Sequence, residues 1–411
     1  MRGLVVLALC RPRLLPRSSG AFGISFSTEP YGSSEGKSVV RVGQIGVGKM
    51  GLSHLAIANT HPDAELVGVC DNASLLLDGL RRFAGFKTFS DYRKMLDRER
   101  LDAIIVATPT SLHEEIVKAA LDRSISVFYE KPFCLNAERG RSLAALAVER
   151  GLVNQVGYHA RFLASFQEAK LILESGVLGR LHHIKAEAYG AVVLRPKGGT
   201  WRARRKEGGG CLYDYASHAI DLVNFLVGAP VAVSGTMLPS IYSSGVEDAV
   251  YSNLVFAGGL TGQIEANWSD PSYRKMTLRV SIWGSNGRMD ADRQQVQTYL
   301  RNDSGGRHGH TQGWNTRYTT DLTLPMWYYL RGEEYSAQID YFIRRVKDRN
   351  LENISSFEDA SKTDQVMAQM AADHAAGPTL PHGRSAEPAV ALAQPAPTTR
   401  FRERWAARGR G

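Results

Sequence analysis

A glycine-rich turn between two strand-like runs constrains the fold more than any other feature of the chain. Residues 39–45 lead into Gly46-Val47-Gly48-Lys49-Met50-Gly51, and a helix-like segment follows over 52–59. A second apolar run, 65–70, ends at Asp71, twenty residues after Gly51. Strand, glycine turn, helix, strand and acid in this order are typical of a dinucleotide-binding βαβ unit.

Each residue of the turn suits a dinucleotide for its own physical reason. Gly46 permits the tight turn, Gly48 lets a pyrophosphate approach the backbone, and Gly51 lets the helix pack on the strand. Lys49 and Met50 open the helix, whose free N–H groups are expected to point at the phosphates. All five residues are therefore predicted cofactor contacts.

The acid at the end of the second run selects between the two nicotinamide dinucleotides. A carboxylate at Asp71 can bond the 2′-hydroxyl of the ribose, and it repels the 2′-phosphate of NADP. The next residue is Asn72 and not an arginine that would hold such a phosphate. The sequence therefore predicts NAD as the cofactor in preference to NADP.

The alternation of apolar runs and helical segments continues to about residue 160. An apolar run over 101–107 ends in Thr108-Pro109, and a run over 126–129 ends in Glu130-Lys131-Pro132. A helical segment and a run over 152–157 complete a predicted six-stranded, doubly wound parallel sheet, so the chain is expected to be an α/β protein. Such sheets bind ligands at the carboxyl ends of their strands, where the predicted cofactor contacts are Thr108, Pro109, His113, Glu130 and Lys131.

The pattern changes after residue 160 to longer β-type runs. These runs cover 231–238, 249–256, 260–268 and 276–283, and turn residues such as Gly258-Gly259 separate them. They predict an α+β second domain with a large, mostly antiparallel sheet. The few helical segments can cover only one face of it, and an open face that carries Tyr and Trp predicts self-association.

Composition and pattern divide the 411 residues into four parts. Residues 1–38 form an extension, 39–160 the dinucleotide-binding Rossmann domain, and 161–376 the substrate-binding and oligomerisation domain. The two helical segments that end the second domain are expected to return to the first. Residues 377–411 are rich in Pro, Ala and Arg and are predicted to be disordered.

The net charge of +9 comes mostly from the two ends of the chain. Residues 1–38 carry +3 and residues 377–411 carry +4, so about +2 is left for the residues between them. Because the excess positive charge lies in the two tails, it gives no reason to expect that the folded part binds nucleic acid.

The N-terminal extension bears on localisation. Its apolar stretch, Leu4–Cys10, is seven residues long and too short to span a bilayer, so no membrane anchor is expected. Four arginines with no acid before Glu29 are typical of a transit peptide for organelle import, but an unstructured extension or a wrongly assigned start explains them as well. Four cysteines without a CxxC pair favour a reducing compartment, and the cytoplasm is the predicted location.

Five motifs occur in order along residues 39–376. They are the glycine turn, Ala107-Thr108-Pro109 with His113, Glu130-Lys131-Pro132, Gly157-Tyr158 with Arg161, and Gly208-Gly209-Gly210 followed by Asp214, His218 and Asp221. In combination they resemble the glucose–fructose oxidoreductase / inositol dehydrogenase (Gfo/Idh/MocA) family, although Thr110 stands where that family often has Asn. The resemblance implies an NAD(P)-dependent dehydrogenase of CH–OH groups, a homodimer or homotetramer formed through the open sheet face, and a cis bond before Pro132.

Three polar residues form the predicted catalytic group. Asp214 and His218 are four residues apart, so they share one face of a helix, and the triple glycine before them is expected to be a flexible lead-in. An alcohol oxidised by NAD⁺ must lose its hydroxyl proton, and a neutral imidazole suits that task, so His218 is the predicted general base. Asp214 is expected to orient this imidazole or to hold a neighbouring substrate hydroxyl. Lys131 is expected to stabilise negative charge on the reacting oxygen, and the family resemblance implies the same three roles.

The expected substrate is a small polyol or sugar. Its predicted contacts are Tyr158, Arg161, Trp201, Arg202, Asp214 and His218. Residues 195–207 carry a local charge of +5, which predicts either arginine contacts to an anionic substrate, such as a nucleotide sugar or uronate, or a solvated loop. His308 and His310 lie in a glycine-rich stretch without an acidic or cysteine companion beside them, so no metal site is expected.

Three functions are compatible with these residues. The first is an NAD-dependent oxidoreductase that transfers hydride from a secondary alcohol of a sugar, nucleotide sugar or cyclitol. The second is an NAD-assisted glycosidase or lyase on the same fold, which net production of NADH would separate from the first. The third is a non-catalytic dinucleotide-sensing regulator, which has no need for Lys131, Asp214 and His218 together.

Overall fold

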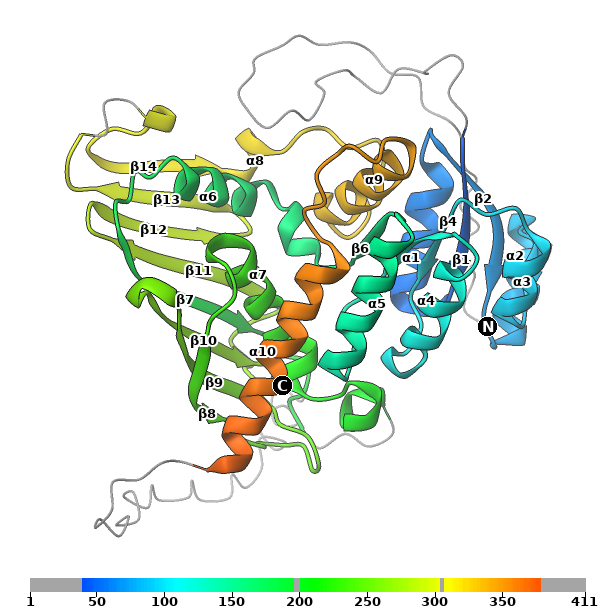
Figure 1. Ribbon diagram of the computed structural model, residues 1–411, viewed down its shortest axis with the longest axis horizontal. Coiled ribbons are helices and arrows are strands. Elements are labelled where there is room, and N and C mark those ends of the chain that lie inside the picture. The colour runs from blue at the N-terminus through cyan, green and yellow to red at the C-terminus, as the bar shows by residue number, and fades with distance from the viewer. Residues whose placement is uncertain (1–38, 196–199, 304–306, 378–411) are drawn as a thin grey trace, which may run out of the picture. The chain divides into compact units, whose positions relative to one another are not determined.

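Two sheets of different construction follow each other along the chain (Figure 1). The computed structural model describes residues 39–195, 200–303 and 307–377. The first sheet has six strands and the second has eight. This confirms the predicted fold class, a doubly wound sheet followed by a second domain with a larger sheet.

The first sheet is wholly parallel and has the strand order β3-β2-β1-β4-β5-β6. Its strands are β1 (Val40–Ile45), β2 (Ala64–Cys70), β3 (Thr88–Phe89), β4 (Ala103–Val106), β5 (Ser126–Tyr129) and β6 (Asn154–Val156). The chain changes direction across the sheet between β1 and β4, and ligands of such folds bind outside the carboxyl ends of the strands at this point. The sequence located every strand but β3, which is only two residues long.

Helices cover both faces of the first sheet, and its central strands β4 and β5 are buried along their whole length. The helices between its strands are α1 (Lys49–Thr60), α2 (Ser74–Ala84), α3 (Tyr92–Arg98), α4 (His113–Leu121) and α5 (Ala137–Glu149). A helix from the far end of the chain, α9 (Glu333–Lys347), also belongs to this layer. Its Ile339 and Phe342 share a core cluster with Val42 of β1 and Phe128 of β5.

The second sheet has the order β14-β13-β12-β11-β7-β10-β9-β8. Its strands are β7 (Leu181–Tyr189), β8 (Ala232–Met237), β9 (Ala249–Val255), β10 (Thr261–Asn267), β11 (Thr277–Gly284), β12 (Gly287–Asp292), β13 (Gln295–Leu300) and β14 (Gly313–Tyr318). All neighbours are antiparallel except β7 and β10, which confirms the mostly antiparallel prediction. Strands β12 to β14 were not predicted.

One face of the second sheet packs against α6 (Ala164–Glu174), α7 (Ser217–Val227) and α10 (Phe357–Ala376). Figure 1 shows α10 passing from α5 of the first domain to β8 of the second. Thus α9 packs against the first sheet, whereas α10 contacts both α5 and β8. The boundary near residue 160 stays a prediction, because the described residues up to Ala376 form one compact unit.

The other face of the second sheet carries exposed aromatic side chains and paired charges. Tyr251, Tyr299 and Trp314 are exposed, and Lys185 lies 3.0 Å from carboxylate oxygens of both Glu187 and Glu265. Self-association through this face stays a prediction.

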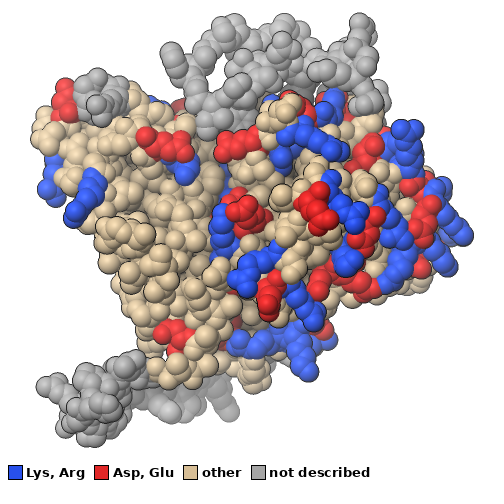
Figure 2. Space-filling model, viewed as in Figure 1, with Lys and Arg blue, Asp and Glu red and all other residues tan. Residues whose placement is uncertain are grey.

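Charged side chains gather on the helices of the first sheet, with both signs interspersed (Figure 2). Many of them are paired, as are Arg139 with Glu114 (3.0 Å) and Lys118 with Asp122 (2.7 Å). Among the described residues, no helix combines the length and the apolar character needed to cross a membrane.

Candidate active site

The glycine turn at the end of β1 has the geometry that a dinucleotide needs. Gly46 has a positive φ of 87°, and a Cβ there would lie 2.6 Å from the carbonyl of Ala107. A Cβ on Gly51 would lie 2.0 Å from the Gly46 oxygen, so helix and turn touch through this glycine. A Cβ on Gly48 would meet nothing within 4 Å, and α1 begins at the next residue without a side-chain cap. This open helix end fits the phosphates of NAD.

Replacing Gly51 by alanine is expected to lower the free energy of unfolding by about 1–3 kcal/mol, because the added methyl group overlaps the Gly46 oxygen. NAD affinity should fall with it. The matched control is Gly48→Ala, whose methyl group meets no protein atom and should leave stability unchanged while weakening NAD binding. Urea unfolding and NAD titration measure both quantities. Equal stability of the two variants would contradict the assigned packing role of Gly51.

Asp71 lies at the end of β2, beside the glycine turn. One carboxylate oxygen accepts a hydrogen bond from the backbone N–H of Val47 (2.7 Å), and the other accepts one from Ala73 (2.9 Å). The side chain is only partly buried. Asp71 thus ties β2 to the turn, at the place where the sequence puts the ribose contact.

The loop after β4 contains Thr108 and Pro109, and His113 supports it from inside the protein. The Nε2 of His113 lies 2.6 Å from the carbonyl oxygen of Thr108, and its ring packs edge-on against Tyr129. Burial lowers the pKa of His113 to about 3, so the ring is neutral and donates to that oxygen. Thr108 and Pro109 lie at the ligand edge of the sheet, whereas His113 acts through the loop.

Glu130, Lys131 and Pro132 follow β5, and the Lys131–Pro132 bond is cis, as the family resemblance implies. Glu130 faces α1, where its carboxylate lies 2.5 Å from Nε2 of the buried His54. A Cβ on Gly157 would lie 3.3 Å from the same carboxylate. No sequence pattern indicated His54, which only the tertiary fold brings to Glu130.

Lys131 reaches from the first sheet to Asp214 of the second domain. Its Nζ lies 2.8 Å from a carboxylate oxygen of Asp214 and 2.8 Å from the Asp214 carbonyl oxygen. Arg202 approaches the second carboxylate oxygen at 2.9 Å. Burial by itself raises the pKa of Asp214, but the charges of Lys131 and Arg202 outweigh burial and lower it. The carboxylate is therefore ionised and held between two cations.

His218 is buried on α7, close to this pair. Its ring centroid lies 4.8 Å from that of His159 and 6.1 Å from that of Tyr158. Burial, followed by the charge of Lys131 and by His159, places the pKa of His218 well below its usual value, so the imidazole is neutral. Within the described part of the chain, neither His218 Nδ1 nor the Tyr158 hydroxyl has a hydrogen-bond partner.

The helix predicted to carry both Asp214 and His218 is not regular. Asp214 lies in a π-helical turn, η5 (Leu212–Ala216), and α7 begins only at Ser217. In the described residues the Asp214 carboxylate bonds to Lys131 and Arg202, not to His218. Of the two roles predicted for Asp214, these contacts favour holding a substrate hydroxyl over orienting the imidazole.

The triple glycine is a site of tight packing, so the predicted flexible lead-in is wrong. A Cβ on Gly209 would lie 2.4 Å from the carbonyl oxygen of Arg202. Gly210 has a φ of 108°, and a Cβ there would lie 2.2 Å from the buried Glu247 carboxylate. Glu247 also accepts a hydrogen bond from Leu212 N–H (2.9 Å) at the start of the π-helical turn. The glycines therefore bring this turn close to Arg202 and Glu247.

Three of the predicted substrate contacts join the group, and Arg161 does not. Arg202 stacks on Trp201, with its guanidinium carbon 4.6 Å from the ring centroid, and reaches Asp214. Tyr158 contacts the ring of His218. Arg161 is buried and bonded to Asp221, so its position does not favour a substrate contact.

The sequence patterns did not indicate two residues that lie near His218, namely His159 and Tyr335. His159 stacks between His218 and Tyr335, with 4.8 Å between ring centroids on each side. Burial, and then nearby cations of which Arg293 is the strongest, lower the pKa of His159 to about 3. The only signal in the sequence was the position of His159 directly after Gly157-Tyr158.

Two cavities are candidates for the substrate site. One of about 460 Å³ is lined by residues of α5, β6, α9 and α10, such as Ala144, Asn154, Arg345 and Asp359, and does not border the Lys131–Asp214 pair. A smaller one of about 80 Å³ is lined by Arg202 and Trp268, among others. Of the two, only the smaller cavity is lined by a residue that contacts Asp214, namely Arg202.

Two family models match the chain. The model described as "Oxidoreductase family, NAD-binding Rossmann fold" matches residues 40–158. The model described as "GFO/IDH/MocA C-terminal domain" matches residues 166–290. The first of these matches spans the six-stranded sheet. The other match spans most of the residues that form the eight-stranded sheet.

Curated relatives and solved structures agree with these matches. The chain is 28% identical over 255 residues to scyllo-inositol 2-dehydrogenase (NAD(+)) of Bacillus subtilis, covering 60% of this chain and 72% of the relative. It is 27% identical over 310 residues to levoglucosan dehydrogenase of Pseudarthrobacter phenanthrenivorans, covering 66% and 78%. A solved levoglucosan dehydrogenase in complex with NADH and levoglucosan shares the fold, with a TM-score of 0.72 at 22% identity, over 82% of this chain and 98% of that one. The glycine turn, the Lys131–Asp214 pair and these matches lead to one conclusion: the chain belongs to the Gfo/Idh/MocA family of NAD-dependent oxidoreductases.

Proposed function

We propose that the protein oxidises a secondary alcohol of a neutral sugar or cyclitol and passes the hydride to NAD. One observation carries the proposal. Lys131, at the ligand edge of the first sheet, is bonded to Asp214 of the second domain, and a buried neutral His218 lies beside them. The dehydrogenases of inositol and levoglucosan among the relatives support this substrate class.

The cofactor would be held along the carboxyl ends of β1, β2, β4 and β5. We assign the pyrophosphate to Gly46, Gly48, Lys49, Met50 and Gly51, the ribose 2′-hydroxyl to Asp71, and the nicotinamide end to Thr108, Pro109, Glu130 and Lys131. NAD, when bound, supplies the acceptor for the hydride. The carboxylate of Asp71 favours NAD over NADP, because it would repel a 2′-phosphate.

The protein's own residues would handle the proton and the charge. His218 is neutral, so its lone pair is available to take the hydroxyl proton. Lys131 would donate to the reacting oxygen and stabilise the negative charge that develops there. Asp214 would accept a hydrogen bond from a neighbouring hydroxyl while it keeps Lys131 in place.

Charge pairing around the site favours a neutral substrate over an anionic one. Three arginines of the basic segment each have a carboxylate partner: Arg202 with Asp214 (2.9 Å), Arg204 with Glu207 (3.0 Å) and Arg205 with Glu247 (2.6 Å). Glu207 is already counted in the local charge of +5 of residues 195–207, and Asp214 and Glu247 lower that charge to +3. An anionic substrate would have to break these pairs before the arginines could bind it.

A panel of alcohols tests the proposal. Inositols, neutral sugars, uronates and nucleotide sugars are each incubated with NAD⁺ or NADP⁺, and NADH or NADPH is followed by absorbance. We expect NADH from a neutral cyclitol or sugar with NAD⁺. Bond cleavage without net NADH would instead support the NAD-assisted glycosidase or lyase. NADH formed only with uronates or nucleotide sugars would refute the neutral substrate class.

A further inference from the structure

We propose that the ion pair between Arg161 and Asp221 is a positioning clamp that holds Tyr158 and His159 against the His218 ring. The inference rests on the proposed function in one respect, because it takes His218 to be the general base. It assigns no substrate contact to either member of the pair. Both are positioning residues.

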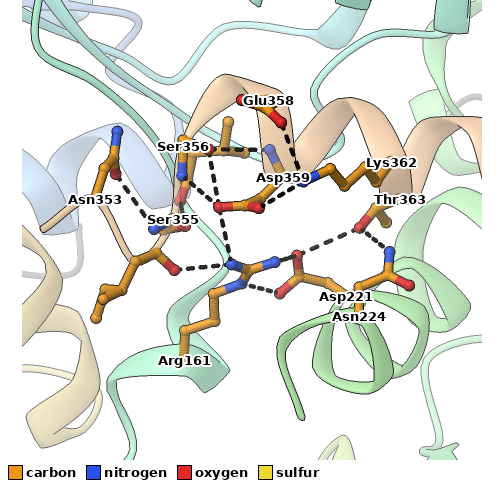
Figure 3. Close-up of polar contacts among 12 residues, drawn as sticks. Arg161, Asp221, Asn224, Asn353, Ser355, Ser356, Glu358, Asp359, Lys362 and Thr363 are labelled. Atoms are coloured by element: carbon orange, nitrogen blue, oxygen red, sulfur yellow. Dashed lines mark hydrogen bonds and ion pairs between the residues drawn. The ribbon is translucent and has the colours of Figure 1, made fainter. Parts of the chain in front are cut away.

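The clamp is a buried, two-point contact (Figure 3). Arg161 Nε donates to one carboxylate oxygen of Asp221 at 2.8 Å, and Nη2 donates to the other at 2.7 Å. Both side chains are almost wholly buried, at 4% and 1% exposure. Two parallel hydrogen bonds from a planar guanidinium fix the orientation as well as the distance between two segments.

The two segments joined by the clamp are the ones that meet at the His218 ring. Asp221 lies three residues after His218 on α7, so both are on adjacent turns of one helix. Arg161 lies in the short helix η2 (His159–Phe162), directly after Tyr158. Tyr158 and His159 are also the residues whose rings contact His218, at 6.1 and 4.8 Å. The clamp therefore sets how closely these rings cover the imidazole.

A third segment, at the start of α10, supports the clamp from the other side. Arg161 Nη1 donates to the carbonyl oxygen of Ile354 at 2.8 Å and lies 3.5 Å from a carboxylate oxygen of Asp359. Thr363 donates to Asp221 at 3.4 Å and accepts from Asn224 of α7 at 3.1 Å. Figure 3 shows the Arg161 guanidinium between Asp221 and Asp359, and Thr363 between Asp221 and Asn224. All three guanidinium nitrogens of Arg161 donate hydrogen bonds within this network. This explains why Arg161 does not contact the Lys131–Asp214 pair.

Arg161→Lys is the test variant, because it keeps the charge and removes the two-point geometry. Arg317→Lys is the matched control. Arg317 pairs with the buried carboxylate of Glu168 at 2.5 Å and belongs to β14, away from the His218 ring. If Arg161→Lys does not fold, Thr363→Val carries the test, with a smaller effect expected in the same direction. It removes the hydrogen bond that Thr363 donates to Asp221 and the one that it accepts from Asn224.

The first readout is the ionisation of His218, followed by NMR of the full chain labelled with ¹⁵N-histidine and assigned with His218→Gln. Besides α7 itself, the groups that face His218 are Lys131, Tyr158 and His159. Loosening the clamp admits water and lets His159 move away, so the midpoint of His218 should rise by about one pH unit or more in Arg161→Lys. It should not move in Arg317→Lys. An unchanged midpoint in both would overturn the clamp.

The second readout is turnover. In Arg161→Lys we expect kcat to fall by about ten- to hundredfold while the affinity for NAD stays the same, because the base is misplaced and the glycine turn is untouched. Wild-type activity in Arg161→Lys would overturn the clamp and leave the proposed function standing. If the wild type reduced no NAD with any alcohol, the proposed function would fail, and the NMR comparison would still decide whether the clamp holds the rings on His218.

Discussion

Replacing Lys131 by methionine is expected to lower kcat by about two to three orders of magnitude while NAD affinity changes little. Methionine keeps most of the length of the side chain but cannot donate to the reacting oxygen. It also removes one of the two cations that hold the Asp214 carboxylate, leaving Arg202. Initial rates with the substrate found in the panel and NAD titration by fluorescence measure the two effects.

The same variant has a second consequence, which a structural defect would not produce. Lys131 contributes, after burial, to lowering the pKa of His218. Its removal should raise that pKa, so the acidic limb of the kcat profile should move to higher pH. Lys118→Met is the control, because Lys118 is an exposed lysine paired only with Asp122 in the described contacts. A Lys131→Met enzyme with most of its activity would refute the role assigned to Lys131.

Acidification is expected to destabilise the protein steeply, because the folded protein buries histidines in their neutral form. Burial is the main cause that lowers the pKa of His113 to about 3, of His159 to about 3, and of His218 well below 6.5. In the unfolded chain the same rings take up protons below about pH 6.5. The unfolded state therefore binds more protons than the folded state, and stability is lost as the pH falls through this value.

The size of this effect follows from linkage. Each of the three histidines can cost about 1.4 kcal/mol per pH unit, so together they reach roughly 4 kcal/mol per unit well below pH 6.5. That is a large part of an ordinary unfolding free energy of about 5–15 kcal/mol. Urea unfolding between about pH 7 and about pH 5 measures the slope, and His113→Phe should reduce it by about one proton. A stability that stays flat over this range would contradict the neutral burial of these rings.

The parallel half of the fold could be predicted from sequence because buried strands leave a strong pattern. β4 and β5 are short apolar runs that are soon followed by proline or by charged residues, and such runs have few other interpretations. β12 to β14 lack this pattern. Their outer face carries polar and charged side chains such as Arg288, which pairs with Asp290 of the same strand at 2.8 Å. Only pairing with β11 and with each other identifies them as strands.

A site residue could be predicted where its type and its place in a motif allow few roles. It could not be predicted where its role depends on which residue it contacts in the fold. Lys131 and Asp214 were both predicted, and the fold brings them within 2.8 Å. Arg161 was predicted to contact substrate because, in a sequence, a buried arginine and a substrate-binding arginine look alike until a partner such as Asp221 is located. His54, His159 and Glu247 take their positions from contacts between segments far apart in sequence, which no local pattern records.

Lys131, Asp214 and His218 are proposed to serve direct hydride transfer from a substrate carbon to NAD. Deuterium on the carbinol carbon of the alcohol that is active in the panel tests it directly, with mass spectrometry of the dinucleotide after turnover. The expected result is NADH that carries one deuterium, formed in equal amount to the ketone and almost absent with Lys131→Met. Unlabelled NADH, or substrate cleavage with NAD⁺ unconsumed, would contradict the account.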